Sequence, residues 1–208
     1  MGPLDPSLAA SFILTAAAVV LSPGPDTLLI LRYTLGSGRD VGLAAVAGVQ
    51  IGLLVHTALA VAGLSVLLLS APTAFKLVAV VGAAYLGWLG VQSLRGTELA
   101  LGATPNVAAV KAFRDAIVTN VLNPKVIVLF VALFPNFVDP GLGRVAEQLA
   151  WLAALLIVIN VAWQVPLAWA ADTLRRWLLS PSVARAVARS TGVILIAFAI
   201  AMLVEHFF

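Results

Sequence analysis

Two apolar segments of this chain, about one hundred residues apart, are each interrupted by proline directly after a residue that can cap a helix. The first interruption is SPGPD at residues 22–26, and the second is NPK at residues 123–125. An offset of 101 residues places Pro124 on Pro23. Ser or Asn followed by Pro is typical of a helix start. Since a helix that stops and restarts in a bilayer must lie in protein or beside a cavity, two equivalent breaks indicate a transporter's substrate site.

The composition places this chain in lipid. It is 62% hydrophobic and 10% charged, whereas soluble domains carry roughly 25% charged residues. Apolar stretches about long enough to cross a core of ~30 Å cover residues 8–31, 41–69, 73–94, 112–134, 149–171 and 190–208. We expect an all-α membrane protein of six transmembrane helices, the first and fourth broken at the proline motifs, in a single transport domain over residues 1–208. The start lacks the positive region of a secretory signal, so we expect the first segment to be retained.

Basic residues are concentrated in alternate connections between these segments. One set comprises Arg32, Arg39, Arg95, Lys111, Arg114, Arg175, Arg176, Arg185 and Arg189, against Lys76 and Arg144 on the other face. The positive-inside rule makes the first set cytoplasmic and puts both termini outside. Three helices per half then invert the second repeat (101–208) relative to the first (1–100). Because topology accounts for the basic charge, no nucleic-acid partner is expected.

The first break predicts an anion site next to a carboxylate. N–H groups freed at the positive end of a half-helix attract anions, and the carboxylate of an amino acid would suit them after both Pro25 and Pro124. Asp26 could receive the ammonium of the same guest or carry a proton. In the alternative interpretation, the prolines end the segment at the cytoplasmic edge and Asp26 lies in water beside Arg32.

The second break places a charge within apolar sequence. Lys125 is followed by nine further residues of segment four, and a charge at the centre of a membrane helix costs roughly 2.5–3.5 kcal/mol on insertion scales. We therefore expect an ion pair, with Asp26 as the first candidate partner, although snorkelling of Lys125 to the headgroups would also serve. His56, near mid-membrane, could relay protons or simply pack.

Other segments carry spaced small or polar residues. Gly48, Gly52 and His56 recur every four residues on one helix face, which allows close helix contact. Asn160 and Gln164 form a polar stripe in segment five, which hydrogen bonds between helices would explain without a substrate. Glycines around the aromatic residues of segments three and six indicate packing faces.

The motifs of enzymes and cofactor sites are absent. The chain has no cysteine, which excludes disulfides and thiolate metal sites. It has no phosphate-binding glycine loop ending in Lys-Ser/Thr, so we expect neither an enzyme nor a bound cofactor or metal. The candidate substrate-binding residues are Ser22, Pro23, Gly24, Pro25, Asp26, Asn120, Asn123, Pro124, Lys125 and Gln164. The candidates for proton coupling are Asp26, His56 and Lys125.

Three runs of this sequence resemble the LysE/RhtB family of bacterial amino-acid exporters. They are residues 21–64, 82–95 and 119–139, which begin LSPGPDTLLI, GAAYLGWLGV and TNVLNPKVIV. The resemblance implies export of amino acids across the bacterial cytoplasmic (inner) membrane, driven by an ion gradient. It extends to the neutral-substrate branch (homoserine, threonine, leucine) at least as much as to the basic one. The family pattern falls on Pro23, Gly24, Pro25, Asp26, Asn123, Pro124 and Lys125.

We therefore expect a multi-pass antiporter that works by alternating access, with an amino acid as substrate and protons or sodium as coupling ion. Two alternatives stay open, an exporter of inorganic cations and a membrane assembly protein without transport activity. Exposed faces rich in small residues would also allow two copies of this chain to pack as a homodimer within the bilayer.

Overall fold

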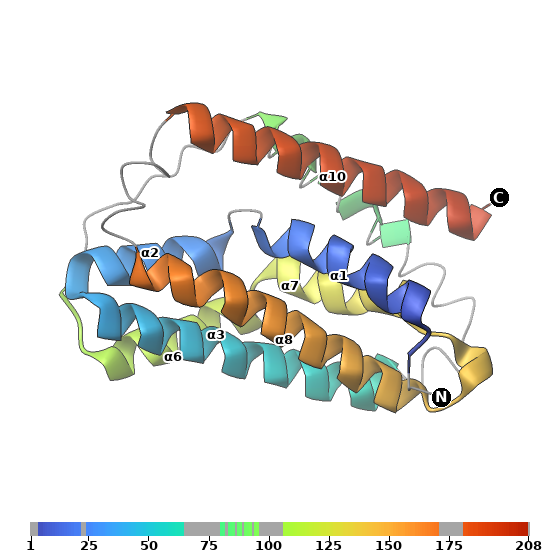
Figure 1. The fold of residues 1–208 in the computed structure, drawn as a ribbon, viewed down its shortest axis with the longest axis horizontal. Coiled ribbons are helices and arrows are strands. Elements are labelled where there is room, and N and C mark those ends of the chain that lie inside the picture. The colour runs from blue at the N-terminus through green and yellow to red at the C-terminus, as the bar shows by residue number, and fades with distance from the viewer. Residues whose placement is uncertain are drawn as a thin grey trace.

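Every regular element that the computed structural model describes is a helix (Figure 1). It describes residues 4–21, 24–64, 106–170 and 181–207, and residues 80–95 apart from 82, 86, 89 and 93. The α-helices are α1 (Pro6–Leu21), α2 (Pro25–Ser37), α3 (Arg39–Leu59), α6 (Ala109–Val121), α7 (Pro124–Val128), α8 (Val145–Trp169) and α10 (Pro181–Phe207). Shorter turns are the π-helices η1 (Ala60–Leu64) and η2 (Leu129–Leu133) and the 3-10 helices η3 (Phe134–Phe137) and η4 (Pro140–Leu142).

Both predicted breaks are present. The axes of α1 and α2 meet at 51°, and those of α6 and the segment Pro124–Phe137 meet at 49°. Each restart has proline at the first helical position, where its missing N–H is not needed. Asn123 caps α7 by accepting a hydrogen bond from the Lys125 backbone N–H at 3.0 Å. In the first half the restart differs from the prediction, because the N-cap of α2 is Gly24 in extended backbone.

The restart at Pro25 means that α2 begins two residues later than an exact copy of the second break would. The predicted cap Ser22 and its neighbour Pro23 lie outside the described residues. Gly24 has no side chain that could cap α2. The first backbone N–H groups of this helix therefore receive no side-chain acceptor from the N-cap position.

Among the described residues, two helices are each long and apolar enough to cross a membrane, α8 and the continuous stretch Arg39–Gly63 of α3 and η1. If each bent pair is one span, the described part of the chain holds up to four. Outward side chains are apolar, with Leu14, Leu122 and Val158 65–74% exposed. Such a surface suits lipid. The chain is thus an all-helical membrane protein, while the count of six and the inversion remain predictions.

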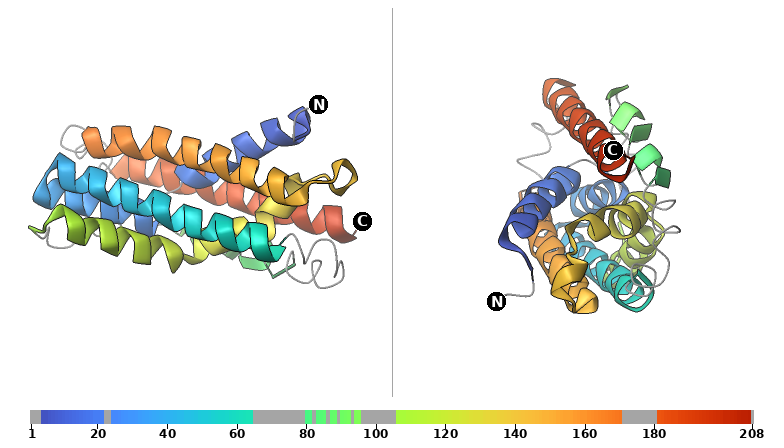
Figure 2. Two further views of the ribbon diagram at one scale, coloured as in Figure 1. Left: turned by 90° about the horizontal axis from the view of Figure 1, so that it is seen from below. Right: turned by 90° about the vertical axis from the view of Figure 1, so that its right-hand side faces the viewer.

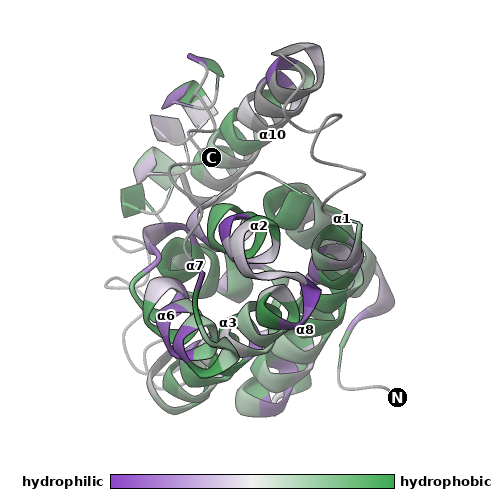
Figure 3. Ribbon diagram, turned by 90° about the vertical axis from the view of Figure 1, so that its left-hand side faces the viewer, coloured by the Kyte–Doolittle hydropathy of each residue, from purple (hydrophilic) through white to green (hydrophobic). Residues whose placement is uncertain are grey.

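Charged residues gather at one end of the bundle, where α2 ends and α3 and α6 begin (Figure 3). The Arg39 guanidinium lies 4.4 Å from the ring centroid of Trp169, the last residue of α8. Arg144 precedes the first residue of this 25-residue helix and so lies at the opposite end.

Several basic residues predicted for connections lie on helices instead. Arg32 and Arg114 are exposed on α2 and α6, and Arg185 and Arg189 are exposed on α10. Helices therefore extend past their apolar stretches, because a charged side chain at a helix end can reach water while its backbone stays helical.

The buried apolar side chains form two clusters. One surrounds Phe12, whose ring packs edge-on against Phe134 and Phe137 at 5.2 and 5.3 Å between centroids. The second, around Ile30 and Val49, joins α2, α3, α6 and α8. Beside this bundle α10 runs next to the segment 80–95 (Figure 2). A Cβ on Gly192 would lie 2.7 Å from the Gly90 carbonyl oxygen, so these segments pack through glycines as predicted.

Candidate functional site

The two helix breaks meet inside the protein at Asp26. Its side chain, in the first turn of α2, is only 9% exposed. Asp26 Oδ2 accepts hydrogen bonds from Asn120 Nδ2 at 2.9 Å and Asn123 Nδ2 at 3.1 Å, the residues on either side of the second break. Asp26 is therefore buried and joins the two halves, rather than lying in water beside Arg32.

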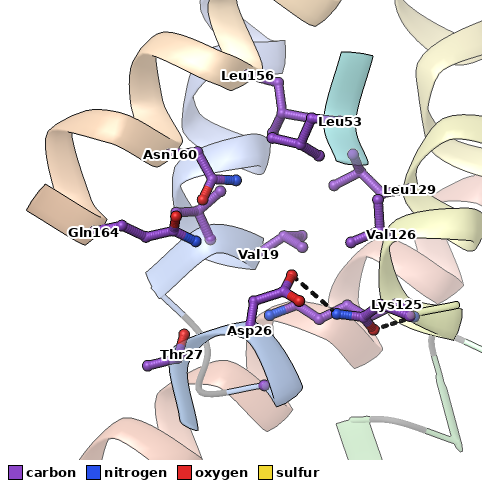
Figure 4. A pocket seen from close by; sticks show the side chains of 13 residues that line it. Val19, Asp26, Thr27, Leu53, Lys125, Val126, Leu129, Leu156, Asn160 and Gln164 are labelled. Atoms are coloured by element: carbon purple, nitrogen blue, oxygen red, sulfur yellow. Dashed lines mark hydrogen bonds between the residues drawn. The ribbon is translucent and has the colours of Figure 1, made fainter. Parts of the chain in front are cut away.

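A pocket opens next to this junction, with about 420 Å³ of space not filled by protein atoms, part of it open to the outside. Its polar lining comes from α2, the α7 start and α8 and comprises Asp26, Thr27, Asn123, Lys125, Asn160 and Gln164 (Figure 4). Its apolar lining comprises Val19, Val20, Leu53, Val126, Leu129 and Leu156. Gly24 completes the wall. The pocket is thus amphipathic and lies between helices of both halves.

Lys125 brings the second charge to this pocket. A Cβ built on Gly24 would lie 3.6 Å from both Cδ and Nζ of Lys125, so the amine reaches the backbone of the first break. The side chain is half-buried. One carboxylate and one amine therefore line the same pocket, and their predicted direct pairing remains a prediction.

The glycine stripe of α3 faces α6 and holds Asn120. A Cβ on Gly48 would lie 2.3 Å from the Phe113 carbonyl oxygen, and one on Gly52 would lie 2.4 Å from Asn120 Oδ1. Only glycine at these positions lets the helices approach this closely. Asn120 is completely buried as a result.

His56, on the same face of α3 one turn after Gly52, also contacts Asn120. Its Nε2 lies 3.3 Å from the Asn120 carbonyl oxygen, and its ring stacks on Phe130 with 5.4 Å between centroids. The side chain is 7% exposed and is not among the residues that line the pocket. His56 thus contacts Asn120, which in turn holds Asp26, and its proton-coupling role remains a prediction.

The polar stripe of α8 faces the pocket. Gln164 Oε1 accepts a hydrogen bond from Gln50 Nε2 at 3.0 Å, which binds α3 to α8. Asn160, one turn earlier, also lines the pocket; it was not among the predicted substrate-binding residues, because hydrogen bonds between helices alone would explain its stripe. Thr27 was not predicted at all, and its position directly after Asp26 was the available signal.

Several buried acceptors around the pocket receive no hydrogen bond from the described residues. They are Asp26 Oδ1, Asn120 Oδ1, Asn160 Oδ1 and Gln50 Oε1. Buried polar atoms are nearly always bonded, and of these four residues Asp26 and Asn160 line the pocket, so Asp26 Oδ1 and Asn160 Oδ1 are suited to donors on a guest. Within the described ranges, no three His, Asp or Glu side chains come together as metal ligands.

Comparison with known proteins identifies the family. Residues 17–206 match the family described as LysE type translocator. The chain is 29% identical to the uncharacterized membrane protein YrhP of Bacillus subtilis, over 91% of this chain and 95% of the relative. It is 31% identical to a homoserine/homoserine lactone efflux protein of Salmonella typhimurium, over 88% and 89%. It is 33% identical to a leucine efflux protein of Salmonella choleraesuis, over 74% of each.

No solved structure matches the chain. The family description and the names of these characterised relatives are those of translocators and efflux proteins, not of enzymes. Since the family match spans nearly the whole sequence and includes both helix breaks, the chain belongs to the LysE type translocators.

Proposed function

We propose that this protein exports amino acids from the cytoplasm as a secondary transporter driven by an ion gradient. The observation that carries the proposal is the junction of two helix breaks at Asp26, in a pocket that Lys125 also lines. Two relatives with 31% and 33% identity are named for efflux of homoserine and leucine. Both are α-amino compounds, so they support an amino acid as the substrate.

The charges of the pocket suit a zwitterion. The ammonium of an amino acid binds Oδ1 of Asp26, which accepts no hydrogen bond from the described residues. Its carboxylate binds Lys125 at the break beside Gly24. Burying either charge of the protein alone is costly, and a guest with one charge of each sign compensates both. The N-terminus of α2 adds a positive end near the carboxylate.

Asp26 is also the proposed coupling residue. In one direction of the cycle it holds the ammonium of the substrate, and in the other it holds a proton. Because the same oxygen cannot bind both, outward movement of substrate is tied to inward movement of protons. Sodium in place of the proton is the alternative that the assay below separates.

The proposed architecture is six transmembrane helices in two inverted repeats in the bacterial inner membrane, with the basic end of the bundle in the cytoplasm and both termini outside. Reporter fusions that are active only in the cytoplasm test the orientation. A fusion at Gly102 should be active and one at Pro72 inactive, and the reverse pattern would overturn the orientation. Chemical cross-linking in native membranes tests the proposed homodimer.

Efflux from preloaded membrane vesicles tests the function. Vesicles are loaded with a panel of labelled amino acids and energised, with and without a proton uncoupler. We expect export that the uncoupler abolishes. Export that persists with the uncoupler but requires a sodium gradient would identify sodium, not protons, as the coupling ion. Movement of a divalent cation without any amino acid would overturn the proposal in favour of a cation exporter.

Asp26→Asn should abolish export, and Asp40→Asn is its matched control. Asp40 is also an aspartate in the first turn of a helix, but it is exposed. The substitution removes one charge in each case, and only the first removes it from the pocket. Full export by Asp26→Asn would show that this carboxylate is not needed.

Lys125→Gln and the double neutral variant test the predicted ion pair. If Asp26 and Lys125 stabilise each other directly, removing both charges should restore protein stability relative to either single variant. If the double variant is no better than the singles in stability and transport, direct pairing loses its support, while binding of a zwitterion by the two residues still stands.

A further inference from the structure

The pocket changes in polarity along the direction of α8. Three of its lining residues, Leu156, Asn160 and Gln164, follow one another at intervals of four, so each is displaced about 6 Å along the helix from the last. In Figure 4, Asp26 and Lys125 lie at one end of the pocket, Leu156 and Leu53 lie at the other, and Asn160 lies between them.

This gradient fixes the orientation of an amino acid, given the proposed function. Its charged groups lie with Asp26 and Lys125, because no other charged side chain lines the described pocket. Its side chain then points past Asn160 toward Leu53 and Leu156. The first atoms of that side chain lie at the level of Asn160, and longer aliphatic chains reach the leucines.

The side chain of Asn160 offers a hydrogen-bond acceptor at the level of the first atoms of the substrate's side chain. The side chain is 8% exposed, and its Oδ1 is buried and accepts no hydrogen bond from the described residues. An ammonium carries three N–H donors, and Asp26 Oδ1, which also accepts no hydrogen bond from the described residues, holds a cation more strongly than a neutral amide does. Because Asn160 lies beyond Asp26 toward the leucines, the donor that reaches its Oδ1 in this orientation is on the substrate's side chain.

We propose that Asn160 is a specificity-determining residue whose Oδ1 accepts a hydrogen bond from a hydroxyl on the substrate's side chain. The substrates are then neutral amino acids with short side chains, hydroxylated ones held by Asn160 and aliphatic ones held by the leucine wall. A basic side chain is disfavoured, because its second cation would be buried among Asn160 and leucines without a second carboxylate.

The test compares two amino acids of the same shape. L-Homoserine and L-norvaline differ in a terminal hydroxyl against a methyl group, and vesicles loaded with an equal mixture report the ratio of their efflux. Asn160→Leu keeps the number and branching of the side-chain heavy atoms and removes the acceptor. The ratio of homoserine to norvaline efflux should fall about five- to tenfold. Val161→Leu, the neighbouring position, which is 37% exposed on the outside of α8, should leave the ratio unchanged.

The outcomes separate this inference from the proposed function. If the unsubstituted protein exports no amino acid, the proposed function itself fails. If it exports both and Asn160→Leu lowers both equally, Asn160 serves the ammonium or the fold, and the inference is overturned. Export of L-lysine faster than norvaline also overturns it. Should Asn160→Leu not reach the membrane, Asn160→Ala is assayed for the same ratio with the same expected fall.

Discussion

Gly52→Ala would press directly on the residue that holds Asp26. A Cβ at this position would lie 2.4, 2.7 and 2.8 Å from Oδ1, Cβ and Cγ of Asn120. All three distances are below 3.0 Å, closer than Cβ atoms approach other atoms in proteins. These three atoms belong to a short side chain on a tightly packed helix and cannot move far on their own. To make room, α3 and α6 must separate or Asn120 must turn away. Overpacking of this kind costs about 1–3 kcal/mol.

Gly63→Ala is the matched control for this change. Both glycines are helical, and alanine gains about 0.5–1 kcal/mol at such positions from its lower flexibility in the unfolded chain. Around Gly63, however, no atom of the described residues outside its own stretch of helix lies within 4 Å of a built Cβ. The difference in free energy of unfolding between the two variants therefore isolates the packing cost.

Two measurements report the effect. Thermal unfolding of the purified protein in detergent should give Gly52→Ala a lower Tm than Gly63→Ala, at about 2–4 °C per kcal/mol for a chain of this length. Amino-acid efflux should fall in Gly52→Ala, because Asn120 no longer reaches Asp26, and stay normal in Gly63→Ala. In an Asn120→Ala background the Tm gap should narrow, since the contacts with Oδ1 and Cγ are gone.

Equal Tm values and equal efflux for the two glycine variants would refute this reasoning. That result would mean that α3 and α6 are not in close contact at Gly52, and that the position of Asn120 does not depend on the glycine. Reduced efflux with an unchanged Tm would instead show that the cost falls on the carboxylate contact alone.

Further contacts predict effects away from the pocket. Tyr33 donates a hydrogen bond to Asp115 Oδ2, which connects α2 to α6 at the end of the bundle where α6 begins. Tyr33→Phe should cost about 0.5–1.5 kcal/mol in thermal unfolding. It should also speed labelling of a cysteine introduced at the buried Thr34, in a chain that has no other cysteine. Gln148, 1% exposed, makes three hydrogen bonds to backbone groups, two of them with Asp139. Gln148→Leu should lower stability by at least about 1–3 kcal/mol, and an unchanged Tm would contradict that role.

The breaks could be predicted from sequence because their causes are local. Proline without an N–H and a preceding cap residue determine where a helix can start, and this identified Pro124 and its cap Asn123 correctly. In the first half the same rule left two starts open, since Pro23 and Pro25 both follow residues that suit an N-cap. Gly24 in extended backbone selects Pro25, a choice that local rules do not make.

The ends of the helices could not be predicted from hydropathy. An apolar stretch marks the part of a helix that contacts lipid or core, whereas hydrogen bonds and caps decide where the backbone stops being helical. For this reason α10 already begins at Pro181 and carries Arg185 and Arg189. The predicted segregation of basic charge does hold for Arg39 and Arg144, which lie at opposite ends of α8. Arg39 contacts Trp169 at the end of this helix, and Arg144 precedes its first residue.

The partners of Asp26 depend on contacts between residues 94 and 97 positions apart, which no local pattern contains. Charge alone favoured Lys125 as the partner, and direct pairing with it stays a prediction, while the hydrogen bonds to Oδ2 come from two neutral amides. Amides orient a carboxylate without neutralising it, so the carboxylate can still bind a cation. Under the proposed function this is what a coupling residue requires, because Asp26 must exchange an ammonium for a proton in each cycle. A carboxylate fully compensated by a fixed ion pair would gain less from either cation. Under this proposal the two asparagines beside the second break orient the Asp26 carboxylate while leaving its charge exchangeable.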